Sequence, residues 1–473
     1  MICIRGVRRT CYVADIAKIS LNVIRIYIRM TISLTIAIVT GVLVCASVVF
    51  LPSLKLGRIR LGTYWLASLV GAIVCLSCGA VPPEYVAQNL VADTAVNPVK
   101  ILALFLSMTF LSVYLDELGV FEYLADKALT FGGTRQTTLF VTLYAIVAVL
   151  TVFTSNDIVV LTFTPFICAF CRRADISPVP YLFAEFVAAN TWSMCLVIGN
   201  PTNIYLATSA GIDFGSYFLT MALPTAVGGV VSFGVLWLLF RKMLASPLRV
   251  APSHLVVSDK TQVIVGAAHL GACIVLLAVS SYIGVEMWMV SVALACSLAL
   301  FATIYGLCAK RGLSVVLRSL RRLPYELIPF VLSMFVLVLA LNYNGDTMRI
   351  AGLLAEGHPV WTVGGSAFVA ANVVNNIPMS VLYSAIVDSG AIVGSAAKQA
   401  VFAAVAASNI GAYLTPVGAL AGIMWLGILK KEHVPIGFGT FVKYGAAVAV
   451  PALAATLGVL CLVVHLYRAK KQN

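Results

Sequence analysis

The stretch Thr137–Phe170 reads TTLFVTLYAIVAVLTVFTSNDIVVLTFTPFICAF, an apolar run that is interrupted at its centre by Thr154-Ser155-Asn156-Asp157. A second run, Trp361–Val387, is interrupted in the same way by Asn375-Asn376-Ile377-Pro378. The arms of the second run are too short to cross a bilayer, which takes about 20 residues of helix. Polar residues at membrane depth are tolerated only where they face protein or a water-filled cavity. We therefore predict two re-entrant hairpins with polar tips.

The chain around these hairpins has the composition of a membrane protein. Of its 473 residues 61% are hydrophobic and 10% are charged, whereas soluble domains carry roughly 25% charged residues. This deficit excludes a soluble enzyme, a disordered regulator and a secreted disulfide module. The predicted fold class is an all-α polytopic membrane protein with about 10 transmembrane helices plus the two hairpins. The expected spans are Thr31–Pro52, Leu61–Val81, Pro98–Leu118, Pro180–Ile198, Phe214–Phe240, Thr261–Ile283, Met287–Leu307, Tyr325–Leu341, Lys398–Leu414 and Phe438–Tyr467.

The charges and cysteines agree with a membrane location. The net charge is +13, but the basic residues lie in short loops beside apolar blocks, where they report orientation and not a nucleic-acid partner. The 12 cysteines are scattered, most of them inside apolar helices, which argues against a disulfide framework. The expected partner is the lipid bilayer of the cell inner membrane, and no removable signal peptide is predicted.

An internal repeat relates the two hairpins. A shift of 219 positions places the first tip on the second, and it also carries Asn190 onto Asn409 and Gly199 onto Gly418. Each half then holds a hairpin followed by a helix that is broken near its middle. The breaks are Gly199-Asn200-Pro201-Thr202-Asn203 and Thr415-Pro416-Val417-Gly418. Paired Gly/Pro-interrupted segments at matching positions indicate the binding site of a transporter.

The basic loops predict that this repeat is inverted. Arg241–Lys260 and Lys310–Arg322 flank two clear spans, so both loops are expected in the cytoplasm. Counting spans from there, the first hairpin enters from the cytoplasm and the second from outside. The apolar and basic residues of 313–322 predict an interfacial helix that joins the halves. The predicted units are a basic tail (1–29), a first half (30–240, hairpin 135–170, broken helix 180–212), cytoplasmic loops and linking helices (241–322) and a second half (323–473, hairpin 361–388, broken helix 398–430).

The N-terminal tail conflicts with this orientation, which places residue 31 outside. Residues 1–29 contain six Lys and Arg residues, which should stay in the cytoplasm. We hypothesise that translation begins at Met30 and that residues 1–29 are not native. N-terminal sequencing of the expressed protein tests this hypothesis.

The tips and breaks are the predicted substrate site. Helix N-termini offer N–H donors to anions, while unwound carbonyl groups coordinate cations or protons. The two tips and the two breaks are expected to converge on one cavity at mid-membrane. For any single Asn or Thr, capping of a hairpin end is an equal alternative, so the pairing between halves is the stronger signal. The residues predicted to bind substrate are Thr154, Ser155, Asn156, Asn200, Thr202, Asn203, Asn375, Asn376, Thr415 and Gly418.

Two carboxyl groups are predicted to bind the coupling ion. Asp157 lies in the first tip, and an intramembrane carboxylate is costly enough to indicate function. Its counterpart Asn376 is neutral, so coupling is expected to be asymmetric. Glu185, in the helix before the first break, is the second candidate, with a structural ion pair to a loop cation as its alternative. Three further carboxyl groups are expected at a membrane face: Asp116, Glu117 and Glu122.

The remaining motifs limit the chemistry. Two Cys-x-x-Cys pairs, Cys75/Cys78 and Cys168/Cys171, are interpreted first as small apolar residues, with a thiolate site for a soft metalloid as the alternative. No stretch matches the Walker A pattern, so the chain carries no P-loop. Transport is therefore predicted to be secondary, with H⁺ or Na⁺ as coupling ion and no cofactor or metal. A separate ATPase subunit is not implied and stays an open partner.

At these motifs the chain resembles the ion transporter superfamily, and within it the arsenite/antimonite efflux permeases. The resemblance covers roughly residues 55–467 and implies a scaffold domain and a transport domain, a homodimer and an elevator-like shift. Dicarboxylate and citrate carriers and sodium/proton antiporters are relatives. Dicarboxylate carriers tend to have Ser-Asn-Thr tips in both halves, and neither tip here has that sequence. The residues that carry the resemblance are Ser155-Asn156-Asp157, Leu161–Phe166, Asn375–Pro378, Ser408–Leu420 and Trp425.

The predicted function is secondary transport of an inorganic anion or metalloid, with proton-coupled efflux of the arsenite type as first choice. A neutral solute like As(OH)₃ needs hydrogen-bonding partners more than cations, and the predicted cavity holds Asn, Thr and Ser. One alternative is cation-coupled uptake of a citrate-like di- or tricarboxylate or another anion. Another is a sodium/proton antiporter that uses Asp157 and Glu185. An enzyme is not expected, and a receptor would not explain the paired hairpins.

Overall fold

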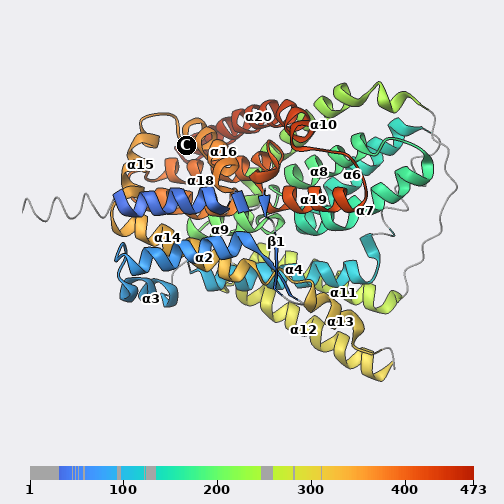
Figure 1. Ribbon diagram of the computed structural model, residues 1–473, viewed down its shortest axis with the longest axis horizontal. Helices are drawn as coiled ribbons and strands as arrows, with labels where there is room; N and C mark the ends of the chain where they lie inside the picture. Colours follow the sequence, from blue (N-terminus) through green and yellow to red (C-terminus); the bar gives the residue numbers. More distant parts are fainter. Residues whose placement is uncertain are drawn as a thin grey trace, which may run out of the picture.

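The structure is a computed structural model. It describes residues 31–44, 46–47, 50–51, 53–56, 59–92, 97–121, 123, 135–246, 259–280, 283–309 and 312–472. The tail of 1–29, the hypothesised start at Met30 and Glu122 lie outside the described residues. Nearly all of the described chain is helical (Figure 1), which confirms the fold class predicted from the composition.

Six described helices are long and apolar enough to cross a membrane, or seven if the pair α14 (Leu327–Tyr343) and α15 (Asp346–Ala355), bent by 78°, is one span. Shorter apolar helices are Thr31–Val44, α2 (Thr63–Ser77) and α16 (Pro359–Val374). Other predicted crossings, such as Pro180–Ile198, are broken helices because Gly and Pro residues interrupt them. The six are α4 (Pro98–Glu117), α6 (Gln136–Phe153), α10 (Phe214–Phe240), α11 (Lys260–Val279), α12 (Met287–Cys308) and α20 (Phe438–Gln472).

A small antiparallel sheet departs from the all-helical prediction. β1 (Ser53–Leu56) pairs with β2 (Ile59–Gly62), with Lys55 opposite Arg60. Residues 54–61 alternate apolar and basic residues over much of their length, which is the period of a strand. Their basic residues indicated only a cytoplasmic loop, so these strands were not predicted. The helix α3 (Pro83–Val91), which begins with a proline at its first position, was also not predicted.

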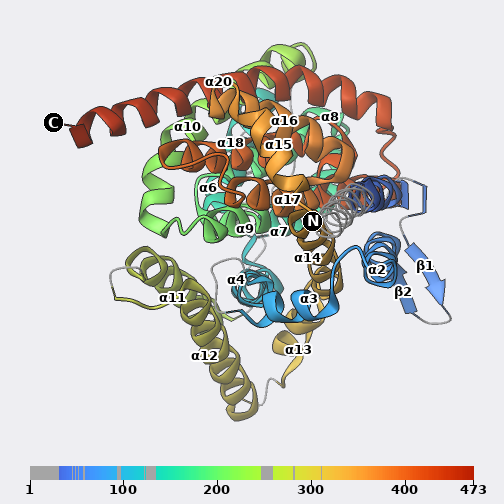
Figure 2. The same cartoon turned by 90° about the vertical axis from the view of Figure 1, so that its left-hand side faces the viewer.

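The described helices form two layers, which Figure 2 shows one above the other. The scaffold layer comprises α2–α4, α11, α12, α13 (Ser314–Arg321) and α14. The repeat layer comprises α6, α10, α16, α20 and six further helices: α7 (Asn156–Ala174), α8 (Val179–Trp192), α9 (Pro201–Ser209), α17 (Asn376–Asp388), α18 (Ser395–Gly411) and α19 (Leu420–Lys431). Within the scaffold layer α4 is central, because α11, α12 and α13 all pack against it. A helix, α13, is present where the sequence predicted one between the two halves, and its interfacial position stays a prediction.

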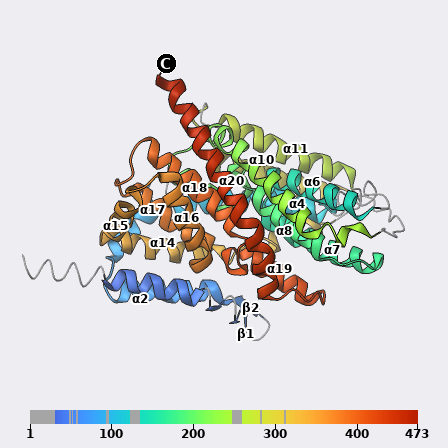
Figure 3. The same ribbon diagram turned by 90° about the horizontal axis from the view of Figure 1, so that it is seen from above.

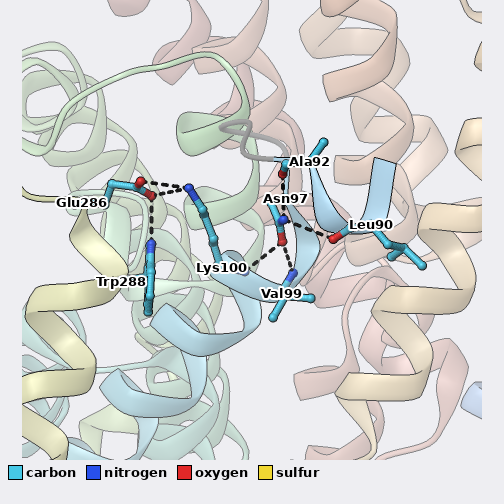
Figure 4. A network of polar contacts seen from close by, with 7 residues as sticks. All are labelled: Leu90, Ala92, Asn97, Val99, Lys100, Glu286 and Trp288. Carbon is cyan, nitrogen blue, oxygen red and sulfur yellow. Dashed lines mark hydrogen bonds and ion pairs between the residues drawn. The ribbon is translucent and has the colours of Figure 1, made fainter. Parts of the chain in front are cut away.

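The start of α4 is anchored to α12 by charged and polar contacts (Figure 4). Asn97 caps α4 by accepting hydrogen bonds from the backbone N–H groups of Val99 and Lys100 at 2.8 and 3.3 Å. The Nζ of Lys100 lies 2.8 Å from a carboxylate oxygen of Glu286, which also accepts a hydrogen bond from the indole of Trp288. These contacts tie the start of α4 to the start of α12.

The internal repeat is present in the backbone. Two short 3₁₀ helices, η1 (Val197–Gly199) and η3 (Pro416–Gly418), are related by the shift of 219 positions. The same shift relates the last residues of the helices before them, α8 (Val179–Trp192) and α18 (Ser395–Gly411). It also relates the first residues of the helices after them. Those are α9 (Pro201–Ser209) and α19 (Leu420–Lys431).

The hairpins enter the molecule from opposite ends. The first consists of α6 and α7 (Asn156–Ala174), and the second of α16 and α17 (Asn376–Asp388). In Figures 1 and 3 the first hairpin lies at one end of the long axis and the second at the other, as an inverted repeat requires. The hairpins also exchange partners, because α7 packs against α19 and α17 packs against α9. One arm of each hairpin therefore touches the broken helix of the other half.

Candidate transport site

The first break is held together by an asparagine from the other half of the chain. The side-chain oxygen of Asn409, on α18, accepts hydrogen bonds from Ser193 Oγ at 2.7 Å and from Asn200 Nδ2 at 3.0 Å. Its amide donates to Asn203 Oδ1 at 2.6 Å. The neighbouring Ser408 donates to Thr202 Oγ1 at 2.7 Å, so α18 fixes all three predicted polar residues of this break.

The first tip joins the same network through α8. Asn156 Nδ2 donates to Asn190 Oδ1 at 3.0 Å, and the Ser193 hydroxyl, which has one proton to share between Asn409 and Asn190, also lies 2.7 Å from the Asn190 backbone carbonyl oxygen. Asn156 Oδ1 and Ser155 Oγ are buried and have no hydrogen-bond partner among the residues that the structure describes. Thr154 donates back to the carbonyl of Leu150, so its hydroxyl terminates α6. The tip therefore presents two enclosed oxygen atoms, of which one belongs to a hydroxyl that can also donate.

The second tip and second break form a separate cluster. Asn375 has a φ of 74°, which is unusual for a residue with a side chain, and its Nδ2 donates to the Val417 carbonyl at 2.8 Å. The Oδ1 of Asn372 accepts hydrogen bonds from the backbone N–H and the hydroxyl of Thr415, at 3.1 and 2.7 Å. Asn376 is buried at the start of α17. In the second half, the backbone is thus strained at Asn375, and hydrogen bonds connect the residues of the tip and the break.

Both breaks depend on a glycine at the same repeat position. A Cβ atom at Gly199 would overlap the backbone carbonyl of Ser193, and one at Gly418 would overlap the backbone carbonyl of Gly411. In each half the 3₁₀ turn therefore folds back against the end of the preceding helix. This close approach is the structural role of Gly418, which was predicted as a site residue.

The two clusters meet between α8 and α18. Thr191 donates a hydrogen bond to the Tyr413 hydroxyl at 3.1 Å, and both residues are buried. The described residues of these clusters are neutral: the hydrogen-bonding groups are Asn, Ser, Thr and Tyr side chains and backbone amides. The arrangement can bind an uncharged polar solute or a cation by oxygen atoms.

Asp157 lies at the first turn of α7, where it is half-buried and favourably placed at a helix N-terminus. No described residue forms a hydrogen bond or ion pair with its carboxylate. Asp157 is not part of the asparagine network, because the hydrogen bonds of that network join other residues.

Glu185 is fully buried on α8, away from the asparagine network. Its carboxylate accepts hydrogen bonds from Thr164 Oγ1 of α7 and from Trp425 Nε1 of α19, both at 3.2 Å. Trp425 packs against Phe186, with ring centroids 5.0 Å apart. Among the ion pairs between described residues none involves Glu185, so the predicted alternative of a pair with a loop cation is not seen there.

A cavity of about 670 Å³ runs along one face of α7. Leu161, Pro165 and Ala169 line it at intervals of one helical turn, and Asp157 precedes Leu161 by one turn. The cavity therefore leads from the end of α7 toward the candidate coupling residue. Arg173 lies at the end of α7 that is far from Asp157 and also lines the cavity.

The opposite wall of the cavity is the end of α4. Asp116 accepts a hydrogen bond from Thr162 Oγ1 at 2.8 Å and pairs with Arg322 at 2.6 Å. Glu117 pairs with Arg318 and Arg322, both at 2.7 Å. These two carboxyl groups, predicted at a membrane face, thus clamp α13 to α4 and link the scaffold layer to the first hairpin.

Several residues of the site were not predicted. Asn409 holds the first break, and the signal that could have identified it is its position 219 residues after Asn190, with a polar side chain at both places. Trp425 was quoted only as part of a motif. The polar residues that complete the networks are the half-buried Asn372 and four buried residues, Asn190, Ser193, Ser408 and Asn409.

The cysteines fit the apolar interpretation. Cys75, Cys168 and Cys171 are buried free thiols, and Cys78 is an exposed one. Within the part of the chain that the structure describes, no group of three or more His, Cys, Asp or Glu residues could hold a metal ion.

The sequence matches a known family and several known proteins. The model of a family described as Citrate transporter matches residues 60–407. The arsenical pump membrane protein of Escherichia coli strain K12 is 28% identical over 419 residues, which cover 85% of this chain and 94% of that protein. The 46 kDa membrane protein of Mycobacterium leprae strain TN is 27% identical over 409 residues, which cover 82% of this chain and 91% of that protein.

The fold is similar to that of a solved transporter. The YdaH transporter of Alcanivorax borkumensis, whose crystal structure is described as having an unusual topology, matches with a TM-score of 0.51 and 13% sequence identity. The match covers 93% of this chain and 98% of that one. At this identity the likeness concerns the fold alone.

Proposed function

Since the chain belongs to the citrate transporter family and is a secondary transporter of the membrane, we propose that it exports arsenite or a similar neutral metalloid in exchange for protons. The resemblance to the ion transporter superfamily, seen first at the tips and breaks, is confirmed by this family match. The arsenical pump and mycobacterial relatives span most of the chain, so the proposal concerns the whole molecule.

The observation that carries the metalloid proposal is the neutral donor set. The network around Asn409 and the first tip consists of amides and hydroxyls, and none of its described members is Lys or Arg. Citrate at neutral pH carries up to three negative charges, and burying them without cations would be costly. As(OH)₃ is uncharged and both donates and accepts hydrogen bonds. The two oxygens that lack a partner among the described residues, Ser155 Oγ and Asn156 Oδ1, are the groups that such a solute would bind.

We assign proton coupling to Asp157 and Glu185, the two predicted coupling-ion residues. Glu185 is enclosed by neutral partners, and ionisable residues inside a membrane protein commonly form proton relays. Asp157 lies where the cavity along α7 approaches the first tip. We propose that a proton held at Asp157 or Glu185 is exchanged for the solute between the two sides of the inner membrane. The homodimer and the elevator-like shift belong to the same proposal.

The test uses everted membrane vesicles from a host that lacks its own arsenite pump. A proton gradient should drive arsenite accumulation in vesicles that contain the protein, and a protonophore should abolish it. Asp157→Asn and Glu185→Gln should lose accumulation, whereas Glu356→Gln, at an exposed carboxyl group on α15, should retain it. Gradient-independent accumulation, or full activity of both site variants, would contradict the proposed coupling.

Cation-coupled uptake of a di- or tricarboxylate is the second candidate, favoured by the helix N-termini at both tips and by the family description. The same vesicles, right side out, would then accumulate citrate only when Na⁺ or H⁺ is supplied. Movement of Na⁺ against H⁺ with neither solute present, followed with a pH-sensitive dye, would instead indicate the antiporter. Arsenite accumulation without citrate uptake supports the first candidate.

A further inference from the structure

A shallow apolar groove of about 310 Å³ lies on the outer side of the scaffold layer, between α4, α12 and α13. Ala103 and Phe110 line it from α4, and Val292 and Ala299 line it from α12. Leu320 and Leu323 close it at the end where α13 crosses α4. The stretch from Ala103 to Phe110 is roughly 10 Å long, since an α-helix rises 1.5 Å per residue. The groove is therefore a narrow apolar channel that ends beside α13.

The basic residues of α13, the helix at that end of the groove, differ in their partners. Arg318 and Arg322, one turn apart, are paired with Glu117 and Asp116 of α4. Arg321 is exposed and forms no ion pair with any residue that the structure describes. In the sequence it directly follows Leu320, which lines the groove, although Arg321 is not itself a lining residue. The end of the groove thus combines apolar side chains with a neighbouring exposed cation.

From this combination we propose that the groove binds an anionic phospholipid, with part of an acyl chain between α4 and α12 and the phosphate at Arg321. The groove walls belong to membrane-spanning helices, so a lipid chain is the apolar molecule that reaches them. Basic pockets between transmembrane helices bind anionic lipid headgroups. The charge of Arg321 selects an anionic headgroup, and the length of the groove fits one segment of a chain.

The site has a consequence for the scaffold. The lipid binds one face of α13, while Arg318 and Arg322 on another face hold the end of α4. A bound lipid therefore stabilises the position of α13 and, through it, the wall of the cavity along α7. This inference does not depend on which solute the protein transports.

The test measures which lipid the purified full-length protein retains. Native mass spectrometry after delipidation and addition of equal amounts of phosphatidylglycerol and phosphatidylcholine should show preferential retention of phosphatidylglycerol. Arg321→Gln and Arg321→Glu, both at an exposed position, should lower this preference by about fivefold or more, because one basic residue near a membrane surface contributes about that factor. Arg241→Gln, at an exposed arginine that ends α10, is the matched control and should leave it unchanged.

A second variant tests the groove separately from the charge. Ala299→Phe fills the groove and should reduce retention of both lipids, with thermal unfolding used to verify that it is folded. Unchanged lipid preference in both Arg321 variants would overturn the proposal. A shift from dimer to monomer in Ala299→Phe, with lipid retention unaltered, would also overturn it and would identify the groove as an interface between two copies of the chain.

Discussion

The two halves of the repeat have the same backbone at the site but different chemistry. The 3₁₀ turns η1 and η3, the ends of α8 and α18 and the starts of α9 and α19 all correspond at a shift of 219 positions. At the same shift, several polar and charged residues of the first half correspond to neutral or apolar residues in the second half. The pairs are Asp157 and Asn376, Glu185 and Ala404, Asn200 and Ala419, Thr202 and Ala421, and Asn203 and Gly422.

This difference indicates that the two halves have different roles at the site. The first half holds the carboxyl groups and the polar break, whereas the second half supplies Asn409, which fixes that break. Asn190, at the equivalent position of the first half, holds the tip of its own hairpin. Equivalent positions have therefore kept the same side chain and taken different partners. If this interpretation is correct, moving a residue between halves should not preserve its function.

Moving the charge between the tips should have the largest effect. Asp157→Asn should reduce gradient-driven transport to the level of vesicles without the protein. The double variant Asp157→Asn/Asn376→Asp keeps one carboxyl group but places it in the second tip, and it should stay inactive because Asn376 begins α17, whereas Asp157 precedes by one turn the α7 residues that line the cavity. The measurement is solute accumulation in everted vesicles. Recovery of transport in the double variant would show that the two tips are interchangeable.

The two equivalent asparagines should differ strongly in stability. Asn409→Ala leaves the polar groups of Ser193, Asn200 and Asn203 without their partner, at about 1–3 kcal/mol for each buried group. Asn190→Ala leaves one buried group, the amide of Asn156, without its partner and should cost about 1–3 kcal/mol in total. Thermal unfolding in detergent should therefore rank Asn409→Ala well below Asn190→Ala. Equal losses would mean that the two halves are held equally by their asparagines.

The sequence predicted the repeat because its signals are local. Polar tips and Gly/Pro breaks are unusual inside apolar runs, so their positions and their common shift could be identified without a structure. The sheet of β1 and β2 was missed because its short alternation lies among basic loop residues. Fewer helices than predicted are long enough to cross a membrane. One reason is that α8 and α18 end at the breaks.

The partners within the site could not be predicted in the same way. Whether Asn203 contacts solute or another side chain depends on how α18 packs. The partner that α18 supplies, Asn409, lies 206 positions further along the chain. Glu185 was identified by its charge, but its enclosure by Thr164 and Trp425 follows from the exchange of partners between hairpins. Residue type alone therefore indicated candidates, while their division into separate clusters required the packing of the two halves.

The paired glycines should respond alike, because here the halves agree. Gly199→Ala and Gly418→Ala each place a Cβ atom against a backbone carbonyl that cannot move independently, so each should cost about 1–3 kcal/mol. Gly427→Ala, on exposed α19 with open space around the position, is the matched control and should be neutral or stabilising. Thermal unfolding measures all three. A tolerated alanine in one half only would show that its 3₁₀ turn is less tightly packed.

The smallest effect is expected where the first hairpin touches the scaffold layer. Thr162 corresponds to Val381 in the second half, so Thr162→Val makes the two hairpins alike at this position. The change removes the hydrogen bond to Asp116 but leaves the ion pair of Asp116 with Arg322, and it should cost about 1 kcal/mol. Because this bond joins the hairpin to α4, transport rate should change more than stability does. A variant with normal transport and lowered stability would limit the bond to a structural role.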